Sequence, residues 1–167
     1  MIASVLQCCT NGINLSTVMR FLIEKISHLR IGWNERPLTE ADFYLLCKRF
    51  KIDVTEMPLT TGGFYYRVMG KDFIAVDSKL PAAKKLLVLF HELGHFLFHT
   101  PESGATANFH GVGRRSRQER EADLFALCAL IPKSRIQRDS IQALIDDEGI
   151  PEEMIAERCS ILERYDL

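Results

Sequence analysis

Apolar residues recur every three or four positions in the first part of the chain, the spacing that places them on one face of a helix. In the first such segment they are Leu15, Val18, Met19, Leu22, Ile26 and Leu29. They predict an amphipathic helix of about four turns, with Gly32 beyond its end. A second helix is predicted after Thr39, which can form a capping pair with Asp42. Its apolar positions are Phe43, Leu46, Cys47 and Phe50.

The pattern then changes to short runs of β-branched and aromatic residues, which are typical of strands. These runs cover residues 52–54, 63–68 and 72–76, and the last two are joined by Met69-Gly70-Lys71, a hairpin signal. We therefore expect a small, mainly antiparallel three-stranded sheet. Strand 64–68 or 73–77 is expected to offer an edge to which an extended protein substrate adds by backbone pairing.

The next segment is apolar almost all round and predicts a buried helix. It begins at Pro81, a favourable first helical residue, and ends at Thr100, before Pro101. Residues 101–115 contain several glycines and small polar residues, so they predict an irregular connection. Long connections of this kind are more often functional than short ones.

Helices are predicted again after residue 115. Ser116 and Glu119 have the spacing of a capping box, and the helix that they begin continues to Pro132. Two further helices are expected at about residues 134–145 and 151–164. The whole pattern predicts one α+β, mostly helical domain. Its expected parts are an N-terminal helical extension (1–35), a core (36–132) and a C-terminal helical pair (133–167).

Composition and charge narrow the function classes. The 167 residues are 47% hydrophobic, enough for the core of one globular domain. The 21 Lys and Arg residues are balanced by 22 Asp and Glu residues, so the broad positive charge of a nucleic-acid-binding protein is absent. No apolar run approaches the roughly 20 residues that span a bilayer, and the first residues lack a basic leader. We expect a cytoplasmic protein that contacts neither membrane nor nucleic acid directly.

The five cysteines do not predict a disulfide framework, because their number is odd and none has C-x-x-C spacing. Cys47 and Cys128 lie in apolar helical patterns and are expected in the core, where a thiol acts as a small hydrophobic group. The adjacent Cys8 and Cys9 have no assigned role.

The predicted buried helix contains His91-Glu92-Leu93-Gly94-His95, an H-E-x-x-H pattern. Residues four apart share a helix face, so His91 and His95 can bind one metal ion, while Glu92 can reach a water beside it. A catalytic zinc takes three protein ligands, so another residue must complete the site. The alternative is that both histidines are core residues whose hydrogen bonds are satisfied within the protein.

The helix after residue 115 is expected to supply the third ligand. Glu119 is assigned to the capping box. Glu121 shares a face with Phe125 and other packed residues and therefore points toward the helix that contains the H-E-x-x-H pattern. A carboxylate in that position needs a cation or a donor, which makes Glu121 the favoured ligand. The other ligand candidates are Asp123, His99, His110 and Glu102. The candidates for stabilising an oxyanion are Tyr65, Tyr66 and His110.

The stretch His-Glu-Leu-Gly-His-Phe-Leu-Phe-His at 91–99 and the stretch Glu-Arg-Glu-Ala-Asp-Leu-Phe-Ala at 119–126 resemble the ImmA/IrrE family of bacterial zinc metallopeptidases. The similarity extends over residues 36–165 and includes Ile131-Pro132. Residues 1–35 lie outside it, and Phe90 stands where a small residue commonly precedes the first histidine.

This resemblance implies a gluzincin-like core with one zinc ion held by His91, His95 and Glu121, and with Glu92 as the catalytic acid and base. It also implies an endopeptidase of narrow specificity that cleaves a helix-turn-helix transcriptional repressor in trans, often in a stress response. A second hypothesis is a non-proteolytic binding module, such as an antitoxin or regulatory partner, with a structural metal.

Direct DNA binding is a third, less favoured interpretation. The last two predicted helices superficially suggest a helix-turn-helix unit. The local basic cluster is Arg114, Arg115, Arg117 and Arg120. However, the turn between the last two helices is acidic and the final helix begins with Glu152 and Glu153, which would face phosphates with the wrong charge.

Overall fold

The computed structural model describes residues 15–100, 106–107, 116–146 and 150–167. Its helices are α1 (Leu15–Ser27), α2 (Glu40–Phe50), α3 (Ala82–His99), α4 (Arg117–Leu130), α5 (Lys133–Arg138), α6 (Ile141–Asp146) and α7 (Glu152–Tyr165). Its strands are β1 (Ile52–Met57), β2 (Gly63–Val68), β3 (Lys71–Asp77) and β4 (Thr106–Ala107). The predicted α+β, mostly helical class is confirmed. None of the helices in the described part of the chain is long and apolar enough to cross a membrane.

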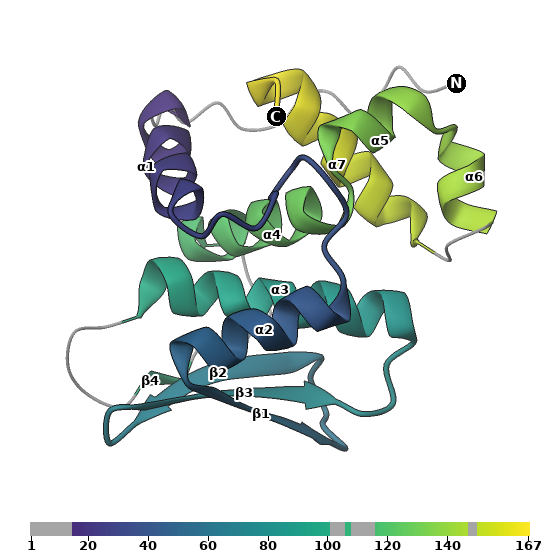
Figure 1. Ribbon diagram of the computed structural model, residues 1–167. Coiled ribbons are helices and arrows are strands. Elements are labelled where there is room, and N and C mark those ends of the chain that lie inside the picture. Colours follow the sequence, from purple (N-terminus) through teal and green to yellow (C-terminus); the bar gives the residue numbers. More distant parts are fainter. Residues whose placement is uncertain (1–14, 101–105, 108–115, 147–149) are drawn as a thin grey trace.

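The elements form layers (Figure 1). Helices α2 and α3 lie across one face of the sheet, α4 packs on the other side of α3, and α1 with the C-terminal helices lies beyond α4. The α2 helix begins with the predicted capping box, in which Thr39 and Asp42 exchange hydrogen bonds. Helix α3, which contains the H-E-x-x-H pattern, is thus enclosed between the sheet and α4.

The sheet is mixed, with the strand order β1-β3-β2-β4. Strands β2 and β3 form the predicted antiparallel hairpin, and its two-residue turn places Met69 and Gly70 at positive φ angles of 50° and 75°. These angles are those of a type I′ turn, which suits the twist of a hairpin. Strand β1 pairs in parallel with β3, and the two-residue β4 adds to β2. The sequence pattern did not predict these two pairings.

Strand β3 has no free edge, because β1 and β2 pair with its two sides. The expectation that strand 73–77 offers an edge is therefore wrong. Among the described residues, strand β4 pairs with β2 at Tyr66 and Arg67.

The helix predicted at 134–145 is two short helices, α5 and α6. Asp139 separates them with an extended backbone, and its carboxylate accepts hydrogen bonds from Arg135 and Arg138. Ser140 then accepts a hydrogen bond from the Ala143 backbone. Asp and Ser side chains compete with helical hydrogen bonds in this way. The C-terminal part consequently contains three helices, not the predicted pair.

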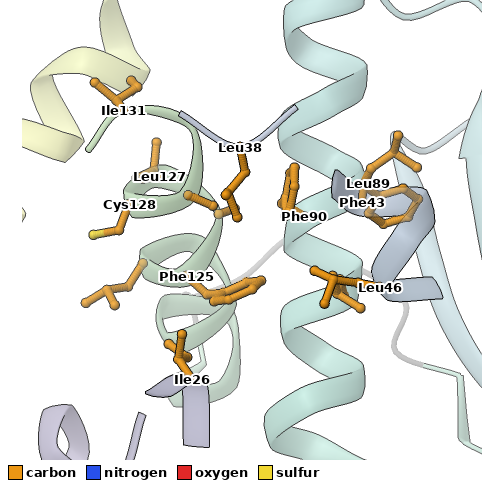
Figure 2. Close-up of a cluster of buried hydrophobic side chains, with 14 of the residues drawn as sticks. Ile26, Leu38, Phe43, Leu46, Leu89, Phe90, Phe125, Leu127, Cys128 and Ile131 are labelled. Carbon is orange, nitrogen blue, oxygen red and sulfur yellow. The ribbon is translucent and has the colours of Figure 1, made fainter. Parts of the chain in front are cut away.

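The core lies where α3, α4, α2 and α1 meet (Figure 2). Phe90 is fully buried, and its ring centroid lies 5.7 Å from that of Phe43 and 6.3 Å from that of Phe125. Cys47 and Cys128 are buried free thiols, as predicted. Burial raises the pKa of Cys47 to about 12 and that of Cys128 to about 11. Cys8 and Cys9 lie outside the described residues.

Helices α3 and α4 are in close contact at Gly94, inside the H-E-x-x-H pattern. A Cβ atom on Gly94 would lie only 3.1 Å from the Cα atom of Ala122 on α4. Any larger residue at position 94 would therefore push the two helices apart. This contact brings the first two turns of α4 against the histidine face of α3.

Candidate metal centre

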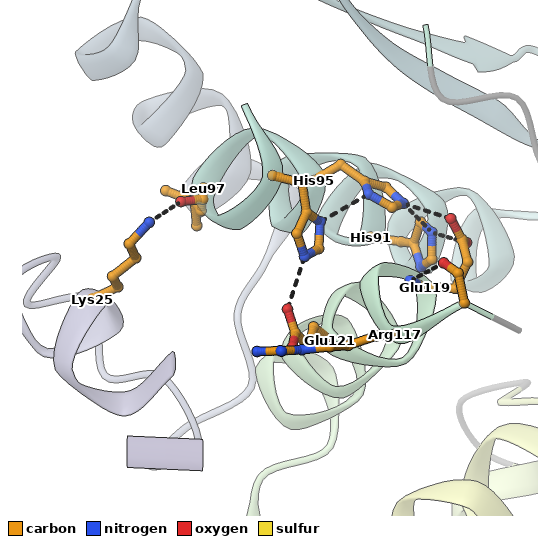
Figure 3. Close-up of polar contacts among 9 residues, drawn as sticks. Lys25, His91, His95, Leu97, Arg117, Glu119 and Glu121 are labelled. Carbon is orange, nitrogen blue, oxygen red and sulfur yellow. Dashed lines mark hydrogen bonds and ion pairs between the residues drawn. The ribbon is translucent and has the colours of Figure 1, made fainter. Parts of the chain in front are cut away.

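His91 and His95 lie one helical turn apart on the face of α3 that meets α4 (Figure 3). Their Nε2 atoms are 3.0 Å apart. His91 is 8% exposed and His95 is fully buried. The predicted pairing of the two imidazoles on one helix face is present in the structure, with both Nε2 atoms directed at one point.

Glu119, at the start of α4, completes the group. Its two carboxylate oxygens lie 3.3 Å from His91 Nε2 and 3.4 Å from His95 Nε2. Ligands about 2.0–2.1 Å from a tetrahedral zinc are separated from one another by about 3.3 Å. The two Nε2 atoms are 3.0 Å apart and each lies 3.3 or 3.4 Å from a different Glu119 oxygen, while one ligand atom from each residue lies within 4.8 Å of the others, close to the spacing of a zinc ligand set. Within the described ranges, these three residues form a group that could hold a metal ion.

The structure does not bring Glu121, the favoured third ligand, to this pair of histidines. Its carboxylate accepts hydrogen bonds from His99 and from Arg117. Glu121 is buried on the packed face of α4, as predicted, but its carboxylate lies against His99 at the end of α3. The capping interaction with Ser116 uses the backbone N–H of Glu119, so the Glu119 carboxylate can face the histidines.

A sequence signal for this arrangement exists. Glu119 and Asp123 are four residues apart, so they share one side of α4, about 200° from Glu121. Asp123 Oδ1 lies 2.8 Å from His91 Nδ1. The two carboxylates at 119 and 123 and the two histidines at 91 and 95 have the same four-residue spacing, each pair on one side of its helix. Glu119 lies against both histidines and Asp123 against His91 alone, which favours Glu119 as the ligand and Asp123 as the residue that orients His91.

The electrostatics of His91 follow from these contacts. Burial alone would lower its pKa, but the hydrogen bonds with Asp123 and Glu119 outweigh burial and raise the pKa to about 9. The site is thus negative enough to hold a proton on His91 at neutral pH. A metal cation is the other species that such an environment stabilises.

Glu92 is fully buried beside the histidines and points toward strand β2. A Cβ atom added to Gly63 would lie 3.6 Å from Glu92 Cγ. The backbone of β2 thus passes close to this carboxylate. The position is the one expected for an acid and base that works between a metal centre and a chain lying along β2.

The tyrosines proposed to stabilise an oxyanion have other contacts. The Tyr65 hydroxyl donates to Asp72 and is also within hydrogen-bond distance of Thr100, and burial raises its pKa to about 12. The Tyr66 ring stacks on Phe73 at a centroid distance of 4.9 Å. Neither arrangement places a hydroxyl at the histidines. The remaining candidates, His110 and Glu102, and the basic residues Arg114 and Arg115 lie outside the described residues.

Comparison with known proteins gives one family. The peptidase family described as the IrrE N-terminal-like domain matches residues 47–160, which include α3, α4 and the whole metal centre. No curated protein and no solved structure matches the chain at a significant level.

Proposed function

The chain belongs to the IrrE N-terminal-like family of peptidases, and from this premise we propose that it is a zinc-dependent endopeptidase of narrow specificity. One observation carries the proposal. The Nε2 atoms of His91 and His95 are 3.0 Å apart, and one Glu119 oxygen lies 3.3 Å from the first and the other 3.4 Å from the second, close enough for the three side chains to hold one zinc ion. The sequence expectation of Glu121 as third ligand is replaced in this proposal by Glu119.

Zinc bound at these residues supplies Lewis acidity, which polarises a peptide carbonyl and acidifies water. Glu92 takes a proton from the attacking water and transfers it to the nitrogen of the leaving amine. Asp123 accepts a hydrogen bond from His91 Nδ1, which leaves the Nε2 lone pair of His91 to bind the metal ion. The side chain of Glu119 is 24% exposed, which leaves the centre open to solvent on that side.

Strand β2 is the proposed support for the substrate. Its first residue, Gly63, lies beside Glu92. An extended peptide that lies along this strand passes next to the acid and base. Position 63 suits only glycine, since a Cβ atom there would lie 2.6 Å from a methyl group of Val88 on α3.

A helix-turn-helix transcriptional repressor is the proposed substrate, cleaved in trans. The chain has 21 basic and 22 acidic residues, so binding to DNA itself is disfavoured. A regulator with this charge balance acts more readily on a DNA-binding protein than on DNA.

The test uses purified protein, its measured zinc content and candidate helix-turn-helix repressors, beginning with any that is encoded next to its gene. We expect the wild type to cleave the repressor and Glu92→Gln to retain zinc but lose about 10³-fold in rate. Glu153→Gln, at an exposed position of α7, is the matched control and should cleave normally.

Two results would contradict the proposal. Equal cleavage by Glu92→Gln and the wild type would remove Glu92 from the mechanism. Full biological activity of Glu92→Gln combined with its loss in His91→Ala would instead identify a binding module whose metal is structural.

A further inference from the structure

The two histidines of the metal centre are held in different ways. His91 is held directly by a carboxylate, with Asp123 Oδ1 2.8 Å from Nδ1. His95 is held by a third imidazole, since its Nδ1 lies 3.1 Å from Nδ1 of His99. His99 Nε2 in turn lies 2.9 Å from Glu121 Oε2. A chain of hydrogen bonds therefore runs from the metal centre through His99 to Glu121.

One arrangement of protons satisfies every contact in this chain. A metal ligand at His95 Nε2 needs its lone pair there, so the proton of His95 is on Nδ1. His95 Nδ1 then donates to His99 Nδ1, which leaves the His99 proton on Nε2. That proton is donated to Glu121 Oε2. The other Glu121 oxygen accepts from Arg117 Nε at 2.6 Å.

Burial makes this chain specific. The side chains of His99 and Glu121 are 5% and 8% exposed, whereas that of Arg117, at the outer end, is 57% exposed. Water has little access to the inner contacts and cannot easily replace a lost partner. Glu121, which the sequence suggested as a ligand, thus has a different use: it fixes the orientation of His99.

We propose that His99, anchored by Glu121, is a positioning residue that fixes the ring orientation and tautomer of the ligand His95 and thereby strengthens zinc binding. The inference rests on the proposed zinc site. It assigns a role to His99 and Glu121, neither of which belongs to the proposed ligand set. Partners of this kind change metal affinity by about 10- to 100-fold.

The experiment measures zinc affinity by competition with a chelator. His99→Phe keeps a ring but removes the acceptor, and we expect zinc to bind about 10- to 100-fold more weakly. His99→Asn retains an acceptor near the place of Nδ1 and should recover much of the affinity. His28→Asn, at an exposed position beyond α1, is the matched control and should bind zinc as the wild type does. Thermal unfolding without zinc shows whether each variant is folded.

Nitrogen NMR of the imidazoles adds a readout that is independent of activity. In the zinc-loaded wild type and in His99→Asn, His95 should show a proton on Nδ1 that exchanges slowly with water. In His99→Phe this proton should exchange quickly. Unchanged zinc affinity and unchanged exchange in His99→Phe would overturn the positioning role.

Failure of the proposed function gives a different result. If the wild type and His91→Ala bind zinc equally weakly, the zinc site itself is wrong, and the role of His99 falls with it. If the wild type binds tightly, His91→Ala binds weakly and His99→Phe matches the wild type, only the positioning role is wrong.

Discussion

Arg158 on α7 and the cluster of histidines and carboxylates between α3 and α4 both bury ionisable groups, but their partners differ. Arg158 is fully buried and donates to three oxygens: Ile131 O at 2.6 Å, Leu167 O at 2.8 Å and Asn34 Oδ1 at 2.9 Å. Each of its three nitrogens thus has an acceptor. The guanidinium connects the end of α4, the loop after α1 and the end of α7 without any added ligand.

The candidate metal centre is richer in acidic groups. Three imidazoles lie among four carboxylates, which belong to Glu92, Glu119, Glu121 and Asp123. Arg117 forms an ion pair with Glu121. The excess of acceptors raises the pKa of His91 to about 9, despite the opposing effect of burial. The comparison contrasts a buried cation whose acceptors all come from the chain with an acidic cluster whose charge favours a bound cation.

The largest expected effect comes from removing a ligand. Glu119→Gln should weaken zinc binding by about 100-fold or more, because it removes one of three protein ligands. Glu121→Gln should weaken binding by about tenfold or less, since it acts only through His99. Chelator competition measures both constants, and the rise in melting temperature on adding zinc gives an independent check. A greater loss in Glu121→Gln would return the ligand assignment to the sequence prediction.

Substitution of Arg158 should change the stability of the fold and leave zinc binding unchanged. We expect Arg158→Met to lower the free energy of unfolding by about 3 kcal/mol, because buried acceptors lose their donor. Arg164→Met, at an exposed position of the same helix, is the control and should unfold like the wild type. Urea unfolding measures the difference. Zinc affinity that falls together with stability in Arg158→Met would break the distinction between the two clusters.

The sequence predicted the features that depend on neighbouring residues. The capping box of α2, the β2–β3 hairpin and the two histidines on one face of α3 all follow from spacings of two to four residues. The placement of Glu119 beside the histidines depends on how α4 is rotated against α3, where Gly94 and Ala122 are in close contact. Helical periodicity identified the packed face of α4 but not the part of α3 that it meets.

Long-range pairing explains the other differences. The parallel pairing of β1 with β3 joins Ile52 to Asp72, and no local pattern specifies that partner. The burial of Arg158 is similar, because two of its acceptors are a main-chain oxygen of Ile131 and the side chain of Asn34. Neither acceptor has a sequence pattern that would indicate a buried arginine.

The pair of Arg67 and Asp72 on the sheet is intermediate between the buried Arg158 and the candidate metal centre. Its substitution has the smallest expected effect on stability. One guanidinium meets one carboxylate, and the Tyr65 hydroxyl donates to the same carboxylate. Burial would raise the pKa of Asp72, but the hydrogen bonds from Arg67 and Tyr65 outweigh it and lower the pKa below its ordinary value. Asp72 is therefore more readily ionised in the folded than in the unfolded chain.

A folded-state pKa below the unfolded value of about 3.9 gives stability that is present above about pH 4 and lost as the pH falls further. Asp72→Asn should thus lower the free energy of unfolding by about 1 kcal/mol at pH 7, and the difference from the wild type should shrink at pH 3. Asp53→Asn, on the exposed side of β1, is the control and should show no such change. Urea unfolding at both pH values provides the measurement. A deficit that stays constant with pH would mean that Asp72 acts through its shape and not its charge, and the pair of Arg67 and Asp72 would then not be an example of matched charges.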